Sequence, residues 1–198
     1  HTEYSIQDGL IRINELADKA EELNFESLAI SDLSNLFGYI KFYKAIRKKG
    51  IKPICSSDFI LSGKNSDSGS IQFIAKNHNG YKNLIRLISK AHTDGKINGD
   101  PQLEVSFLES FSSDLIAITG SLDSQIGKSI ISGKNDIATK QINYLRNIYK
   151  DNLFLQISRI GRDQEEICNQ GIIEIAHELS IPVVATNQVR FLEKSDFE

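Results

Sequence analysis

Short apolar segments alternate with amphipathic helical segments along most of this chain, and the alternation limits the fold more than any other feature. Apolar residues from Leu10 to Leu23 recur at spacings of three and four, which predicts a helix over 10–24. Strands that alternate with helices favour an α/β fold with a mostly parallel sheet. The expected strands are 27–31, 53–61, 71–75, 114–119, 152–158 and 182–187, and the expected helices are 10–24, 36–49, 80–91, 123–132, 136–149 and 163–180.

Most of the expected strands are continuously apolar. A strand covered on both faces has this pattern, so we expect interior strands in a parallel sheet. The segment 62–70 is rich in glycine and serine and predicts a surface loop, so that 53–61 and 71–75 could form a hairpin. The interior strands are expected at 28–31, 53–60, 115–119, 153–157 and 183–186.

Polar side chains follow the expected strands at the point where each one ends. In "PVVATNQVRF" (182–191), for example, an apolar run stops abruptly at a polar cluster. The carboxyl ends of parallel strands meet at one edge of a sheet, and this edge is where α/β proteins place their sites. A candidate site is therefore expected there, from the clusters at 31–35, 57–58, 119–124, 158–162 and 186–190.

Composition narrows the classes of protein to which the chain can belong. Its 198 residues suggest one domain, 1–198, and a net charge of −3 predicts weak or no direct binding to nucleic acid. Cys55 and Cys168 form no CxxC pair, which is typical of free thiols in a cytoplasmic protein. No apolar run approaches the ~20 residues of a membrane span, so no membrane association is expected.

Two local patterns that could carry chemistry are weak. "TGSLDSQIGKS" (119–129) ends like a phosphate-binding loop, but six residues separate Gly120 from Gly127 where that loop has four. An ordinary turn from strand to helix is the better interpretation. His78 and His92 are expected on surface loops beside a helix, and His177 on a helix surface. None of them has a metal-binding spacing.

Five blocks of sequence together resemble one family. They are "HTEYSIQDGL", "LAISDLSNLFGYIKFYKAIRKKGIKPI", "FIAKNHNGYKNLIRLISKAH", "LFLQISRIGRDQEE" and "PVVATNQVRFLEKSDF". In this order they resemble the polymerase-and-histidinol-phosphatase (PHP) domain at the N-terminus of bacterial DNA polymerase III alpha subunits. The resemblance implies a distorted (βα)7 barrel whose last unit or units are truncated. The missing methionine and the charged end "EKSDFE" fit the same expectation, a fragment of a longer polymerase subunit.

The resemblance also implies where a metal site would lie. Metal-binding members hold zinc or manganese with histidines and carboxylates at strand ends, and these ions would activate water for phosphoester hydrolysis. Donor side chains remain at four of the implied positions, but the other four have lost theirs or gained a cation. We therefore expect a vestigial site with no catalytic residue and no metal. The retained positions are His1, Asp8, Asp32 and Asp58, and the altered ones are Leu33, Ile160, Gln188 and Arg190.

Arg190 is the most informative of the altered positions because it puts a permanent positive charge where a metal would sit. We expect Arg190 to pair with Asp32 or Asp58. If such a pair is partly buried, removal of the arginine should cost on the order of 3 kcal/mol or more.

Two functions of different classes follow. The favoured one is a non-catalytic scaffold in DNA replication, which packs against the rest of the alpha subunit and docks the proofreading exonuclease subunit. The alternative is an active metal-dependent phosphoesterase or 3'-5' exonuclease that uses zinc or manganese with His1, Asp8, Asp32 and Asp58. The resemblance places the polymerase carboxylates beyond residue 198, so the parent protein would be a DNA-directed DNA polymerase and this fragment would be inactive.

Overall fold

The computed structural model divides the chain into two compact units. One unit contains His1–Asp58 and Gln188–Glu198, and the other contains Phe59–Asn187. The single domain expected over 1–198 stays a prediction. The structure describes residues 1–6, 8–62, 68–97 and 99–197.

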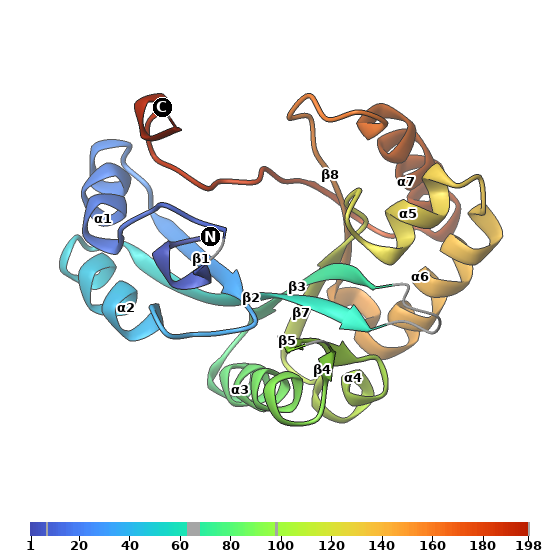
Figure 1. The fold of residues 1–198 in the computed structure, drawn as a ribbon, viewed down its shortest axis with the longest axis horizontal. Helices are drawn as coiled ribbons and strands as arrows, with labels where there is room; N and C mark the ends of the chain where they lie inside the picture. Colours follow the sequence, from blue (N-terminus) through green and yellow to red (C-terminus); the bar gives the residue numbers. More distant parts are fainter. Residues whose placement is uncertain (7, 63–67, 98, 198) are drawn as a thin grey trace. The chain divides into compact units, whose positions relative to one another are not determined.

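The first unit is built around a pair of parallel strands. Strand β1 pairs with the first part of β2 in a register that runs from Ser27 opposite Lys52 to Leu33 opposite Asp58. Helices α1 and α2 pack against each other, as Figure 1 shows. The elements are η1 (Glu3–Ser5), α1 (Ile13–Glu22), β1 (Ser27–Leu33), α2 (Tyr39–Lys48), β2 (Lys52–Ser62) and η4 (Lys194–Phe197).

An apolar core joins the two helices of this unit to β1. The buried faces of α1 and α2 follow the spacing of three and four that the sequence predicts for each helix. Helix α1 is shorter than expected and begins at Ile13. Leu10 lies before the helix and is 59% exposed. The core residues are Ile13, Ala17, Ala20, Ile30, Phe42, Ile46 and Ile51.

The second unit contains a sheet with strand order β2, β3, β7, β8, β9, and β6 also pairs with β2. Strands β7, β8 and β9 are parallel, whereas β3 pairs with β7 in the antiparallel direction. Its elements are β3 (Gly69–Ala75), α3 (His78–Thr93), β4 (Lys96–Ile97), β5 (Asp100–Pro101), β6 (Leu103–Glu104), α4 (Ser106–Phe111), β7 (Leu115–Thr119), α5 (Gln125–Ile131), α6 (Asn135–Tyr149), η3 (Lys150–Asn152), β8 (Leu153–Ile157), α7 (Glu165–Leu179) and β9 (Val183–Ala185).

The predicted α/β class is confirmed, and so are most elements. The sequence missed β4, β5, β6 and α4, since strands of two residues and a helix of six are too short to show a period. Helix α3 is longer than expected. His78 and His92 therefore lie in its first and last turns and not on loops.

Strand β9 differs from its expected interior position. Val183 is 38% exposed, and Ala185 is exposed as well. Among the residues that the structure describes, β9 pairs with β8 alone. The expectation that 183–186 is buried on both faces is therefore wrong, because an apolar sequence shows only that a strand can be covered.

The segment 119–129 forms the expected turn from strand to helix. Gly120 has a φ of +114°, a conformation that glycine adopts without strain. Ser124 caps α5, and its hydroxyl oxygen accepts a hydrogen bond from the backbone nitrogen of Gly127 at 2.9 Å. The backbone amide of Gly127 is therefore engaged by the N-cap residue of α5.

Two further sequence expectations concern thiols and membranes. Cys55 and Cys168 are both free and buried. Burial raises the pKa of the Cys55 thiol to about 12 and that of Cys168 to about 11, so both are protonated near neutral pH. No helix in the described part of the chain has the length and apolar composition needed to cross a membrane.

Candidate functional site

The imidazole of His1 lies between two carboxylates of the first unit. Its Nδ1 is 3.0 Å from Oδ2 of Asp8, and its Nε2 is 2.9 Å from Oδ2 of Asp58. The His1 side chain is only 6% exposed. Three of the residues expected at the site are therefore in direct contact.

The charge of His1 is set by these neighbours. Burial lowers the pKa of the imidazole, but the hydrogen bond and negative charge of Asp58, together with the charge of Asp8, outweigh burial and the opposing charge of Arg190. The net result is a pKa raised above 6.5. The ring can then donate from both nitrogens as an imidazolium, which suits its two carboxylate partners.

Asp58 is positioned by the pairing of β1 with β2. The register places Asp58 opposite Leu33, and the hydroxyl of Ser31 donates to Oδ1 of Asp58 at 2.5 Å. The other carboxylate oxygen bonds to His1. Each oxygen of Asp58 thus has a partner in the protein.

Asp32 is the most deeply buried carboxylate of the site, with 1% of its surface exposed. The backbone nitrogen of Thr2 donates to its Oδ1 at 2.6 Å, and the hydroxyl of Thr2 lies 2.8 Å from its Oδ2. The hydroxyl of Ser5 donates to Oδ1 at 2.8 Å. A buried carboxylate requires such donors, so Asp32 fixes the N-terminal segment on β1.

Arg190 pairs with Asp8. Its Nε lies 2.7 Å from Oδ1 of Asp8, and its carbonyl oxygen accepts from the backbone nitrogen of Leu10 at 2.9 Å. The expected pairing with Asp32 or Asp58 is therefore wrong. Asp32 is occupied by Thr2 and Ser5, so Asp8 is the carboxylate left for the guanidinium.

A close backbone approach allows Asp8 to face His1. A Cβ atom at Gly9 would lie 2.4 Å from the carbonyl oxygen of Thr2, which is closer than a side chain can come. Only glycine fits beside Asp8 without a shift of the backbone. The block "HTEYSIQDGL" thus contains both the carboxylate of Asp8 and the glycine that permits its position.

Two of the remaining positions, Leu33 and Ile160, have apolar side chains without a donor or acceptor. The backbone nitrogen of Leu33 donates to Ser5 at 3.2 Å, while its side chain has no donor or acceptor. Gln188 belongs to the first unit and is exposed. Ile160 belongs to the second unit and is 39% exposed, and its backbone nitrogen donates to Glu165 at 2.8 Å.

Several residues of the arrangement were not singled out from the sequence. Thr2, Ser5 and Ser31 supply the hydroxyl groups that hold Asp32 and Asp58. Small hydroxyl residues do stand near the candidate residues His1 and Asp32, in "HTEYS" and "ISD". Spacing alone does not reveal which hydroxyl reaches which acid.

Glu165 is a second buried carboxylate that the sequence did not reveal. Its oxygens accept from the hydroxyl of Ser158 at 2.8 Å and from the backbone nitrogens of Ile160 and Gly161 at 2.8 and 3.0 Å. Burial acts to raise its pKa, but these hydrogen bonds outweigh it and lower the pKa. Glu165 therefore closes the loop before α7 and has a structural role.

Across residues 1–6, 8–62, 68–97 and 99–197, no group of three or more His, Cys, Asp or Glu side chains is arranged to hold a metal ion.

The family model of the PHP domain matches residues 1–160. The chain belongs to the PHP domain family. Its relatives include the DNA polymerase III alpha subunits of Pseudomonas aeruginosa and Escherichia coli, which are 32% and 35% identical to it over the whole of this chain.

The resemblance inferred from the sequence is thereby confirmed. This PHP chain spans 17% of the length of each of these two relatives. A metal-dependent phosphoesterase from Bifidobacterium adolescentis has a similar structure, with a TM-score of 0.63 and 10% identity over 93% of this chain and 84% of that one. An amidohydrolase from Chromobacterium violaceum gives 0.59 and 10% over 94% and 84%. At this identity the two structures support the fold alone, which agrees with the expected PHP-type α/β barrel.

We expect Arg190→Ala to reduce the free energy of unfolding by about 1 kcal/mol. The reduction is smaller than the sequence suggested, because the Asp8 side chain is 46% exposed and water can solvate it after the arginine is removed. Urea unfolding of the purified chain measures the change. Arg12→Ala, which removes a 71% exposed arginine of the same unit, is the matched control and should cost less. Equal losses for the two variants would contradict a specific role for the pair.

The raised pKa of His1 predicts a stability that depends on pH. A group whose pKa is higher in the folded state stabilises fully below its unfolded value of about 6.5, and this contribution is lost as the pH rises through the folded pKa. The difference in unfolding free energy between the unmodified chain and His1→Gln should therefore shrink as the pH is raised from about 6 to 9. A difference that stays constant over this range would show that the imidazole is not charged by its neighbours.

Proposed function

We propose that this chain is a non-catalytic PHP domain of a DNA polymerase III alpha subunit and acts in replication as a scaffold. The observation that carries the proposal is that the potential metal ligands of the candidate site already have partners within the protein. The permanent cation of Arg190 occupies Asp8, and His1 is bonded at both ring nitrogens. Protein groups occupy the oxygens that a metal would need.

The donor set also fits zinc or manganese poorly. Asp32 accepts hydrogen bonds from the backbone nitrogen and hydroxyl of Thr2 and from the hydroxyl of Ser5, and it holds the N-terminal segment, so recruiting it as a ligand would break that anchor. The imidazole of His1 and the two carboxylates of Asp8 and Asp58 would remain, with the guanidinium of Arg190 beside them. Such a set, with a fixed positive charge, disfavours a divalent ion.

An exposed apolar face, formed by the turn before α2 and by the first turns of this helix, supports the role of a scaffold. Phe37, Ile40 and Tyr43 recur at a spacing of three and are 66%, 56% and 44% exposed. Grouped apolar side chains on a surface are typical of interfaces between proteins or domains. The rest of the polymerase subunit and the proofreading exonuclease are the partners that we propose for the domain, whose net charge of −3 favours protein contacts over DNA.

A metal titration tests the vestigial site. The unmodified chain should carry less than about one equivalent of zinc or manganese and should not hydrolyse phosphoesters, because Arg190 repels a divalent ion. Leu33→His, Gln188→Asp and Arg190→His together add donors within the first unit and should raise zinc affinity by about tenfold or more, measured by calorimetry. Ile137→His, at a 44% exposed position in α6, is the control and should not.

The opposite outcome is equally clear. Stoichiometric metal in the unmodified chain, detected by elemental analysis and abolished by His1→Ala, would support the alternative of an active phosphoesterase or 3'-5' exonuclease. It would overturn the proposal that the metal site is vestigial, because His1 would then be a ligand of the metal.

A binding experiment tests the partner. The immobilised chain should retain the purified proofreading exonuclease subunit of the same organism, whereas an unrelated domain of similar size and net charge should not. The Leu33→His, Gln188→Asp and Arg190→His variant should retain it equally, because a scaffold does not need the site to bind metal. Absence of retention would remove the docking part of the proposal.

A further inference from the structure

The apolar patch at the start of α2 continues into a basic patch towards the end of this helix. Ile40, Lys44 and Arg47 recur at spacings of four and three, so they share one side of the helix, and all three are exposed. The opposite side of α2 is buried in the core of the first unit. The α2 face thus comprises Phe37, Ile40, Tyr43, Lys44, Arg47 and Lys48.

The cations in and next to α2 fall into two groups. The Nζ atom of Lys41 lies 3.4 Å from Oε1 of Glu3, and that of Lys49, the residue after the helix, lies 2.6 Å from Oε2 of Glu21. Helix α2 itself contains no acidic residue. Within residues 1–6, 8–62, 68–97 and 99–197, the remaining cations of the helix form no ion pair. They are Lys44, Arg47 and Lys48.

The helix itself explains only part of this positive charge. Cations in the last turn of a helix interact favourably with its free carbonyl groups, which accounts for Arg47 and Lys48. Lys44 lies before the last turn and has no such role. The chain as a whole has a net charge of −3, so unpaired cations are not a general property of its surface. The α2 face therefore lacks a negative charge that a partner can supply.

The turn before α2 holds the backbone of Phe37 in place. The backbone nitrogen of Phe37 donates to Oδ1 of Asn35 at 3.0 Å, and Nδ2 of Asn35 donates to the carbonyl oxygens of Tyr4 and Leu33, both at 3.0 Å. Asn35 is only 4% exposed. A side chain on a fixed backbone loses little conformational entropy when a partner covers it, so Phe37 is well placed to contribute to binding.

We propose that the α2 face binds a short acidic segment of a protein partner, in which apolar side chains stand beside a group of carboxylates. The apolar side chains would cover Phe37 and Ile40, and the carboxylates would pair with Lys44 and Arg47. This inference rests on the proposed function, because it specifies the chemistry of a segment that the scaffold binds.

The surroundings of the α2 face favour a short peptide over a nucleic acid or a membrane. A long polyanion or an anionic membrane would extend over the neighbouring helix α1, whose exposed carboxylates would repel it. These carboxylates belong to Glu15, Asp18, Glu21 and Glu22. Ile40, in the apolar part of the face, is aliphatic and has no ring on which a base could stack.

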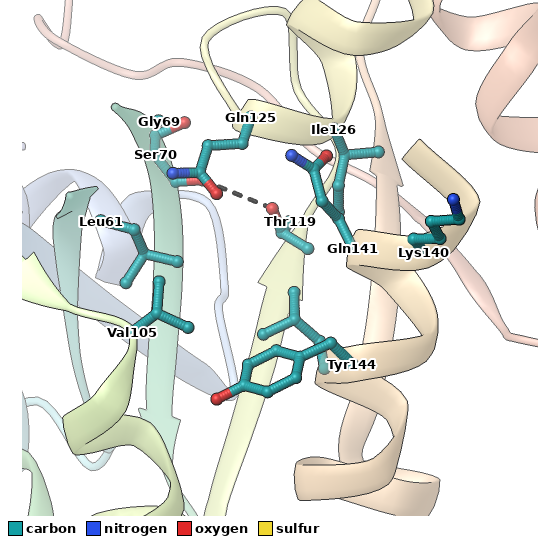
Figure 2. A pocket seen from close by; sticks show the side chains of 11 residues that line it. Leu61, Gly69, Ser70, Val105, Thr119, Gln125, Ile126, Lys140, Gln141 and Tyr144 are labelled. Atoms are coloured by element: carbon teal, nitrogen blue, oxygen red, sulfur yellow. Dashed lines mark hydrogen bonds between the residues drawn. The ribbon is translucent and has the colours of Figure 1, made fainter. Parts of the chain in front are cut away.

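The second unit contains another apolar site, a cavity of about 260 Å³ beside α6. Figure 2 shows Val105 across from the ring of Tyr144, with Gln125 and Gln141 on another side. Among the described residues that line the cavity, Lys140 is the only cation, and its ammonium group points away from the other lining side chains. The cavity could hold an apolar side chain but lacks a group of cations for an acidic segment.

Fluorescence anisotropy of fluorescein-labelled synthetic peptides with the purified chain tests the inference. A short peptide with leucine and phenylalanine in one half and glutamate in the other should bind in a saturable manner. A peptide with lysine in place of glutamate, and one with serine in place of leucine and phenylalanine, should each bind at least about tenfold more weakly. An increase in salt from about 0.05 to 0.5 M should weaken binding of the glutamate peptide, because exposed charges are screened.

Variants locate the interaction. Lys44→Glu and Ile40→Gln should each weaken binding of the glutamate peptide by about tenfold, because the first removes a cation and the second an apolar contact. Lys82→Glu in α3 and Ile137→Gln in α6 make the same changes at exposed positions of the second unit and should have no effect. Val105→Phe, which fills the cavity, should have none either. Urea unfolding verifies that each variant is folded.

Several results would overturn the inference. They are equal binding of the glutamate and lysine peptides, an unchanged affinity in Lys44→Glu or Ile40→Gln, and a loss of binding in Val105→Phe. Tighter binding of oligothymidylate, or of vesicles of phosphatidylcholine and phosphatidylserine, than of the glutamate peptide would identify a nucleic-acid or membrane surface instead. A dimer that Ile40→Gln abolishes, in the absence of peptide binding, would identify a contact between two copies of the chain.

Retention of the exonuclease subunit separates this inference from the proposed function. If the chain retains the exonuclease but the glutamate peptide does not bind, the inference about the α2 face fails and the scaffold function stands. If the peptide binds in a manner that depends on Lys44 but the exonuclease is not retained, the docking part of the scaffold proposal fails and the inference stands.

Discussion

The burial of Asp32 is the constraint on which the rest of the first unit depends. Its carboxylate is almost completely removed from water, and the protein compensates with donors from Thr2 and Ser5. These hydrogen bonds fix the N-terminal segment against β1. Because that segment is fixed, His1 reaches Asp58 on the neighbouring strand, and Asp8 reaches Arg190.

Arginine changes the chemistry that such a cluster can perform. A divalent ion would draw several carboxylates and imidazoles towards one point, whereas a guanidinium pairs with one carboxylate and keeps its charge at every accessible pH. In this chain Arg190 joins the segment after β9 to the segment around Asp8. The physical role of such an ion pair is to hold two distant parts of the sequence together, which is compatible with a scaffold.

The sequence predicted elements whose side-chain period was long enough to observe. Helices such as α2 and α6 and strands such as β1 and β7 lie close to their expected positions. Prediction failed for β4, β5 and β6, which have two residues each, and for the burial of β9. At the site it identified His1, Asp8 and Asp58 through family resemblance, but it missed the hydroxyl groups that hold the acids.

The sequence by itself determined the α/β class, the family and the absence of donor atoms from the side chains of Leu33 and Ile160, because periodicity and residue chemistry are local properties. Only the tertiary structure decided that Arg190 pairs with Asp8, since the choice among three carboxylates depends on which of them already has donors. It also decided that Gln125, Gln141 and Tyr144 line one cavity. Gln125 lies in α5, Gln141 and Tyr144 lie in α6, and sequence spacing does not record how these two helices pack against each other.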